Sequence, residues 1–202
     1  NTSCIKDGIV NKAIIYGKNA SGKTNLILAI FAIINDLTDY NVQDYQYMTY
    51  KNLLSSADET VKFEYEFNLN SRPVKYICEK LDKSTFVSEK LYIDNVLIIN
   101  RDKSQSKFEV NIQGLDNFDN TLNDSALSVI KYVYRNTKIK DFNDEISKTF
   151  INFVNFVEKM LTFYSLHERN YIGFQPKNNT DDIFKKIIER GKIKEFEDLL
   201  RT

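Results

Sequence analysis

The chain has 202 residues, enough to bury a sizeable core, so we expect one domain or one domain with a subdomain. Its 28 Lys and Arg equal its 28 Asp and Glu, which argues against a protein steered strongly toward bulk DNA or an anionic membrane. Cys4 and Cys78 lie far apart and lack metal-ligand spacing, which fits a reducing compartment, so we expect a cytoplasmic protein. No run approaches the roughly 18 apolar residues of a membrane span, so we do not expect membrane insertion.

The first elements follow the order strand, glycine loop, helix. The apolar run AIIYG is of strand type and ends at Gly17. From Gly22 to about Asn35 apolar residues recur at helical spacing, at Leu26, Ala29, Ile30 and Ile33. From Asp36 to Ala57 the pattern weakens into a polar segment rich in tyrosine, which we expect to be a loop with at most a short helix.

A block of short strands comes next. In VKFEYEFNL, apolar and polar residues alternate from Val61 to Leu69, which predicts a half-buried strand with one wet face. Four more short runs follow, VKYICEKL, FVSEKLYI, VLIIN and KFEVNI, separated by turn residues. Parallel pairing would need longer connections, so the five runs predict an antiparallel meander.

The periodicity then becomes helical. Ser125 is the expected N-cap of a helix that carries Leu127, Ile130 and Tyr134. A longer helix is expected to present one apolar stripe, made of Phe142, Ile146, Phe150, Phe153, Val157, Met160 or Leu161, and Tyr164. Two short helices, at 181–189 and 193–200, are expected to meet at Gly191. The expected organisation is a loop core at 1–60, a β-subdomain at 61–113 and a helical region at 125–202.

The residues Gly17, Gly22, Lys23 and Thr24 fit the pattern G-x-x-x-x-G-K-[ST]. A loop that wraps a phosphate must bring several backbone N–H groups to one point, which needs glycine where a Cβ would clash or where φ is positive. The following helix would point its free N–H groups at the phosphate. Lys23 would bridge the β- and γ-phosphates as a point charge, and the Thr24 hydroxyl would ligate Mg²⁺.

Chance produces the bare pattern on the order of once in a hundred chains of this length, and the flanking strand and helix raise its specificity. The competing structural interpretation is a glycine-rich turn with a solvated lysine. The sequence favours binding of nucleoside triphosphate phosphates.

The wider stretch GKNASGKTN adds Asn19, Ser21 and Asn25 to this pattern, and it resembles the Walker A motif of ABC-type ATPases of the SMC, RecF and OLD kind. The block FEYEFNLNSRPVKYICEKLDKSTFVSEKLYIDNVLIINRD, with Glu79, Leu81, Asn100 and Arg101, is similar to the β-subdomain of AAA proteins allied to OLD nucleases and to anti-phage abortive-infection ATPases. The resemblance covers residues 9 to 112, and the helical part more loosely.

The resemblance implies an α/β P-loop NTPase fold with ATP and Mg²⁺ as ligands. The phosphate site would comprise Gly17, Lys18, Asn19, Ala20, Ser21, Gly22, Lys23, Thr24 and Asn25, with Thr24 on the metal and Lys23 as the catalytic lysine. In that class ATP closes a head-to-head homodimer and switches an effector, such as a nuclease, or acts on DNA. No membrane partner is implied.

Other elements of an ABC-type site are missing from the sequence. Asn143-Asp144-Glu145 lacks the apolar strand that precedes a Walker B carboxylate pair, the strand LYID continues with Asn95 instead of Glu, and no serine precedes two glycines as in a signature motif. The chain starts without Met and ends on the helix-like EFEDLLRT, so we expect the front half of an ATPase head that turns over ATP poorly by itself.

Three further side chains and three alternative functions are left open. Gln175 in YIGFQP is either a Q-loop ligand of Mg²⁺ or part of a polar loop before a capped helix, and Gln105 and Gln113 are equally unproven. His167, the single histidine, is expected at the surface. A RecF-like DNA-repair ATPase, an ABC transporter ATPase and a P-loop kinase remain as alternatives.

Overall fold

The computed structural model describes residues 5–6, 9–10, 12–38, 59–82, 85–102, 108–115, 119–138, 143–165, 170–173, 188 and 191–194. The helices within these ranges are α1 (Lys23–Leu37), α2 (Val129–Asn136) and α3 (Glu145–Glu158). The strands are β1 (Ile5–Lys6), β2 (Ile9–Val10), β3 (Val61–Leu69), β4 (Arg72–Lys80), β5 (Phe86–Ile93), β6 (Val96–Asp102), β7 (Glu109–Val110), β8 (Leu161–Ser165) and β9 (Asn170–Gly173).

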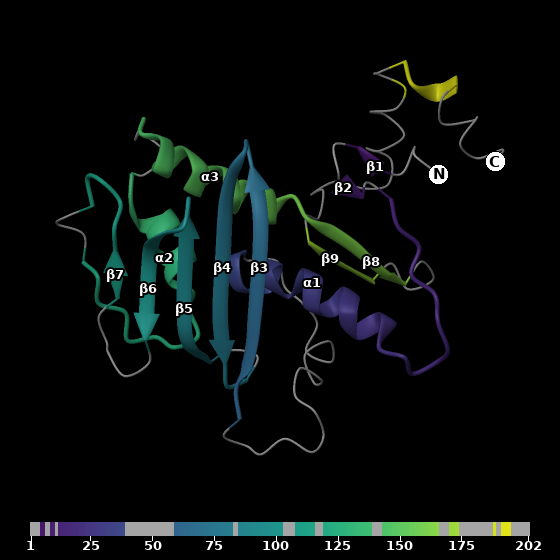
Figure 1. Ribbon diagram of the computed structural model, residues 1–202, viewed down its shortest axis with the longest axis horizontal. Coiled ribbons are helices and arrows are strands. Elements are labelled where there is room, and N and C mark those ends of the chain that lie inside the picture. The colour runs from purple at the N-terminus through teal and green to yellow at the C-terminus, as the bar shows by residue number, and fades with distance from the viewer. Residues whose placement is uncertain are drawn as a thin grey trace.

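The largest unit is a five-stranded antiparallel sheet in the order β3-β4-β5-β6-β7, which confirms the predicted meander (Figure 1). Asn70 and Ser71 join β3 to β4, and Asp94 and Asn95 join β5 to β6. All four have positive φ, between 52° and 64°. Two central residues with positive φ define the hairpin turn whose twist matches that of the flanking strands. The turn chemistry therefore fixes the register of two of the hairpins.

One face of the sheet is covered and the other is open. The helices lie behind the sheet in the view of Figure 1. Strand residues on the covered face, among them Tyr76, Leu91 and Ile99, are fully buried. They form a core with the buried residues of the helices, which include Ile33, Ile34, Leu37, Val129, Ile130, Val133, Phe150, Phe153 and Val157. The fold shown is α/β with two layers, and no described helix is long and apolar enough to cross a membrane.

The start of α2 differs from the sequence prediction. Its N-cap is Ser128 instead of Ser125, and the Ser128 hydroxyl accepts from the Lys131 amide at 3.3 Å. The cause lies on β5, because the buried carboxylate of Glu89 accepts from the Ser128 hydroxyl and from the Val129 amide, each at 2.6 Å. A tertiary contact therefore overrides the local capping signal.

Arg101 makes a second set of tertiary contacts, with the turn before α2. The buried guanidinium of Arg101 donates to the carbonyls of Leu127 at 2.7 Å and Asp124 at 2.8 Å. Arg101 lies opposite Glu89 in the β5–β6 register. The two neighbouring side chains thus bind the carbonyls of the turn and the first amide of α2, and they place this helix on the sheet.

The region expected to be helical after residue 125 also contains a β-hairpin. The long helix ends at Glu158, and the chain continues as β8, which pairs antiparallel with β9. Tyr164 therefore lies in a strand, and the predicted apolar stripe is correct only as far as the helix extends. Phe142 and most of the two short helices expected at 181–189 and 193–200 lie outside the described residues.

A buried ion pair joins α1 to the sheet. The Lys80 ammonium on β4 contacts the Asp36 carboxylate near the end of α1, and the residues are only 3% and 7% exposed. The Phe86 ring lies under this ammonium, 4.8 Å from nitrogen to centroid. Burial raises the pKa of Asp36 more than the neighbouring Lys80 lowers it. The pair therefore holds two charges in a poorly solvated layer.

We expect Lys80→Met to lower the free energy of unfolding by about 3–5 kcal/mol, because Asp36 would remain buried without its cation. The double replacement Asp36→Leu with Lys80→Met removes both charges and should restore most of that loss. Urea unfolding measures both variants, with Lys62→Met on the exposed face as control. A double variant as unstable as the single one would show that the pair contributes more than charge compensation.

Glu89 should make stability depend on pH. Burial raises the pKa of this carboxyl more than the hydrogen bonds from Ser128, Val129 and Tyr76 lower it. The folded state holds the Glu89 proton more tightly than the unfolded state does. The contribution of Glu89 to the free energy of unfolding is therefore complete below about pH 4, and it is lost as the pH rises through the raised pKa. Urea unfolding from pH 4 upward should show a steeper decline in the parent protein than in Glu89→Gln, whereas Glu66→Gln on the open face should follow the parent.

Candidate phosphate-binding loop

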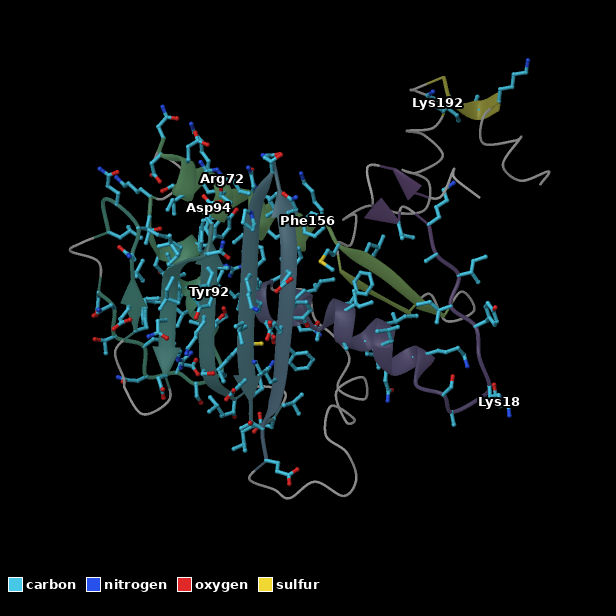
Figure 2. All side chains as sticks on the ribbon, viewed as in Figure 1. Lys18, Arg72, Tyr92, Asp94, Phe156 and Lys192 are labelled. Atoms are coloured by element: carbon cyan, nitrogen blue, oxygen red, sulfur yellow. The ribbon has the colours of Figure 1, made fainter. Side chains whose placement is uncertain are left out.

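The predicted phosphate loop connects an extended segment to α1, and the prediction of a helix starting at this point is confirmed. The amide of Ser21 donates to the carbonyl of Lys18 at 3.3 Å and closes a turn. Ala20 and Gly22 both have left-handed backbone, with φ of 61° and 85°. Figure 2 shows Lys18 well away from the five-stranded sheet. The loop is therefore an exposed, sharply turned structure.

The side chain of Lys23 folds back over this loop. Its ammonium donates to the carbonyl of Gly17 at 2.9 Å and to that of Lys18 at 2.6 Å. The Ser21 hydroxyl oxygen accepts a third, longer bond at 3.4 Å. A Cβ added to Gly17 would lie 3.0 Å from the same hydroxyl oxygen, so the Ser21 side chain would have to move slightly to accept one. The loop thus encloses a positive charge held by its own oxygen atoms.

The N-terminus of α1 suits an anion. The first N–H groups of any helix lack partners inside the helix, and here the N-cap Gly22 supplies no side-chain acceptor. The first turn carries no acidic residue, while Lys23 adds its own charge there. The helix start, with the positive end of its dipole, and the Lys23 ammonium therefore lie within the same short segment, and phosphate binding needs both kinds of group.

The strand expected before the loop is not formed. The run from Ala13 to Tyr16 is extended, but it makes no ladder with any described strand. Ile14 and Tyr16 are each 90% exposed. An apolar run becomes a strand only when a neighbour accepts and donates its backbone hydrogen bonds, and every strand pair in the described ranges is antiparallel. The parallel core expected around the loop is therefore not seen in this part of the chain.

The other predicted site residues are distributed as follows. Asn19, Thr24 and Asn25 are exposed around the loop and the first turn of α1. Gln113 is exposed in a turn beyond β7. Gln175, Gln105 and His167 lie outside the described residues, as do Cys4 and most of the tyrosine-rich segment expected to be a loop.

No carboxylate cluster accompanies the loop in the described part of the chain. Asp144, from the triplet at 143–145 that lacked a preceding apolar strand, is the N-cap of α3 and accepts from the Ser147 amide at 2.9 Å. Cys78 is a free thiol, and burial raises its pKa so far that it is inert as a nucleophile. The described residues contain no group of three or more His, Cys, Asp or Glu placed to hold a metal ion.

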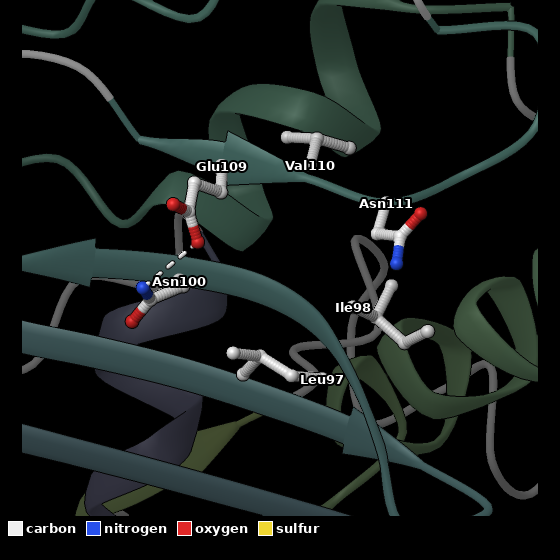
Figure 3. Close-up of a pocket in the computed structure, with 6 residues that line it drawn as sticks. All are labelled: Leu97, Ile98, Asn100, Glu109, Val110 and Asn111. Atoms are coloured by element: carbon white, nitrogen blue, oxygen red, sulfur yellow. Dashed lines mark hydrogen bonds between the residues drawn. The ribbon is translucent and has the colours of Figure 1, made fainter.

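A pocket that the sequence did not indicate lies between β6 and β7 (Figure 3). It measures about 410 Å³ and is lined by Leu97, Ile98, Asn100, Glu109, Val110 and Asn111. The Asn100 amide donates to Glu109 at 3.0 Å, and its carbonyl oxygen is buried without a partner. That oxygen is shielded from solvent, so a ligand in the pocket would not reach it. The pocket also lies at the sheet edge remote from the phosphate loop.

Comparison of the chain with protein-family models, curated proteins and solved structures finds no match. The functional argument therefore depends on the sequence motif and on the geometry of the loop. Gly22, Lys23 and the uncapped helix are the features that the described structure brings together.

Two opposite substitutions test the loop backbone. Gly22→Ala places a Cβ on a left-handed residue and should weaken the first turn of α1 by about 1–2 kcal/mol. Ala20→Gly relieves the same strain and should be neutral or stabilising. Hydrogen exchange of the Leu26 amide, which bonds to the Gly22 carbonyl at 2.9 Å, measures the effect. Faster exchange in both variants would show that the left-handed geometry is absent in solution.

Proposed function

We propose that the loop from Gly17 to Thr24 binds the phosphates of ATP together with Mg²⁺. Backbone N–H groups of the loop and of the first turn of α1 would receive the β-phosphate oxygens. Lys23 would contact the β- and γ-phosphates, and the Thr24 hydroxyl would ligate the metal. Bound Mg²⁺ would neutralise part of the phosphate charge, and the chain's own residues would hold and orient the triphosphate.

The observation that carries the proposal is the position of the Lys23 ammonium over a glycine turn that opens an uncapped helix. A solvated surface lysine would extend into water, whereas this one is held by two carbonyls of the loop. The geometry supports an anion with several oxygens. The choice of adenine nucleotide comes from the resemblance of GKNASGKTN to SMC, RecF and OLD ATPases.

We further propose that the chain acts within an ATPase of this class, with a P-loop NTPase fold, in which ATP closes a head-to-head dimer and switches an effector in anti-phage defence. The exposed Ile14 and Tyr16 support a loop that functions beside additional sheet structure, because strands buried on both faces are apolar on both sides. Without Walker B and signature residues, the chain alone would bind ATP and hydrolyse it slowly.

The open face of the sheet gives no support to a mainly DNA-binding function. Lys62 and Lys75 on this face both pair with Glu64, and Lys75 also pairs with Glu66. A surface that binds DNA phosphates needs basic groups that are not already neutralised by acids. The charge pattern of this face therefore does not favour the RecF-like alternative.

ATP titration by calorimetry tests the proposal. In the presence of Mg²⁺ the parent protein should bind ATP, and Lys23→Ala should bind at least about tenfold more weakly, which corresponds to about 1.4 kcal/mol. Lys138→Ala, which removes an exposed lysine after α2, should bind like the parent. Circular dichroism should show equal folding of all three proteins. Equal ATP affinity of parent and Lys23→Ala would refute phosphate binding at this loop.

A further inference from the structure

Polar contacts join α1 to the sheet at two separate points along the helix. The Tyr65 hydroxyl on β3 donates to the carbonyl of Ala29 at 2.7 Å, near the middle of the helix. The buried ion pair of Asp36 with Lys80 on β4 lies at its end. Seven residues separate the two points, so they are about 10 Å apart along the helix axis.

The N-terminal half of α1 has no comparable attachment in the described structure. Leu26, Ile27 and Ile30 are exposed by 39% to 46%, whereas Ala32, Ile33, Ile34 and Leu37 are buried in the core. Figure 1 shows this half of the helix projecting beyond the edge of the sheet. The phosphate loop is therefore carried beyond the edge of the five-stranded sheet, at the end of α1 opposite its polar contacts, and α1 also contacts β9.

Small changes at the held half are magnified at the loop. Asp36 and Lys23 are 13 residues apart, about 20 Å along the helix, so a tilt of roughly 10° about the C-terminal end moves the loop by about 3 Å. Close packing of Ile33, Ile34 and Leu37 holds the C-terminal half of α1 in the core, and hydrogen bonds and ion pairs add contacts that require a defined geometry. The polar contacts of α1 therefore contribute to its direction.

The charge placement at the end of α1 indicates a role other than stability. A carboxylate near a helix C-terminus opposes the helix dipole, and both Asp36 and Lys80 lose most of their hydration. Lys131 on α2 donates to the Thr38 carbonyl at 3.0 Å and adds a third directional contact there. A buried pair is weak evidence for stability, and its best-attested use is to fix the register of packed elements.

We propose that Tyr65 and the Asp36–Lys80 pair are positioning residues that set the direction in which α1 presents the phosphate loop. This inference rests on the proposed function, since it assigns the contacts that orient the phosphate site. None of the three side chains touches the nucleotide in this proposal. They act through the helix, by holding its middle and its end to two neighbouring strands.

Spin-label distances in the absence of nucleotide test whether these contacts set the direction of α1. One label at Asn25→Cys, in the first turns of α1, and one at Glu66→Cys on the open face of β3 report the direction of the helix. A second pair, Glu66→Cys with Lys148→Cys on α3, reports on the body of the fold. Cys4 is replaced by Ser, and the buried Cys78 is retained.

Tyr65→Phe is the decisive variant, because it keeps the ring that stacks with Phe63, Phe67 and Tyr76 and removes only the hydroxyl. We expect the α1 distance to shift or broaden by about 3 Å when Tyr65→Phe is combined with Asp36→Leu and Lys80→Met, and by a smaller amount in Tyr65→Phe alone. The α3 distance should not change. Tyr92→Phe, on the open face in Figure 2, should change neither distance.

An unchanged α1 distance in Tyr65→Phe and in the combined variant would overturn the inference. If the combined variant does not fold, the single hydroxyl deletion still decides the question. ATP titration of the parent separates the two proposals. If the parent fails to bind ATP but the variants show the distance change, the nucleotide site is refuted and the positioning role of these residues stands. If the parent binds ATP but the α1 distance is unchanged in the variants, only the positioning role is refuted.

Discussion

Burial of charge between the sheet and its helices is the constraint on which the structure depends. Asp36, Lys80, Glu89 and Arg101 all lie in this layer, and each is less than a tenth exposed. Such groups are costly unless every one meets a partner of opposite charge or a backbone group, so the helices can occupy only the positions that provide these partners. The apolar core supplies most of the cohesion, and the buried charges decide where each helix sits.

The sheet could be predicted because its strands and turns are determined by residues that are close together in the sequence. Alternation of apolar and charged residues in β3 marks one wet face, and the turns at 70–71 and 94–95 consist of residue types that tolerate left-handed backbone. The cap of α2 could not be predicted in this way. Ser125 and Ser128 are equally good caps in isolation, and the choice depends on Glu89, which is 39 residues earlier than Ser128. The β8–β9 hairpin was missed because aromatic residues continue the helical stripe past the point where α3 ends.

The candidate site also combines features that the local sequence predicts with features that depend on distant contacts. Glycine spacing and a following helical period were enough to place the loop and the start of α1, since both depend on neighbouring residues. The strand before the loop depends on pairing with another segment, and Ile14 to Tyr16 find no such segment among the described strands. The attachment of α1 through Tyr65 and Lys80 joins residues 36 and 44 positions apart, and periodicity carries no information about contacts at that separation.

The position of β3 has a consequence for how copies of this chain meet in solution. It is a nine-residue strand at one end of the sheet that pairs only with β4 among the described strands, and a long unpaired edge invites strand addition from another molecule. Lys62, Glu64 and Glu66 place a charge at every second residue on its open side, which disfavours an apolar newcomer. The extended run at 14–16 has no such protection. Of these two surfaces, the apolar run beside the loop is therefore the one less protected by charge.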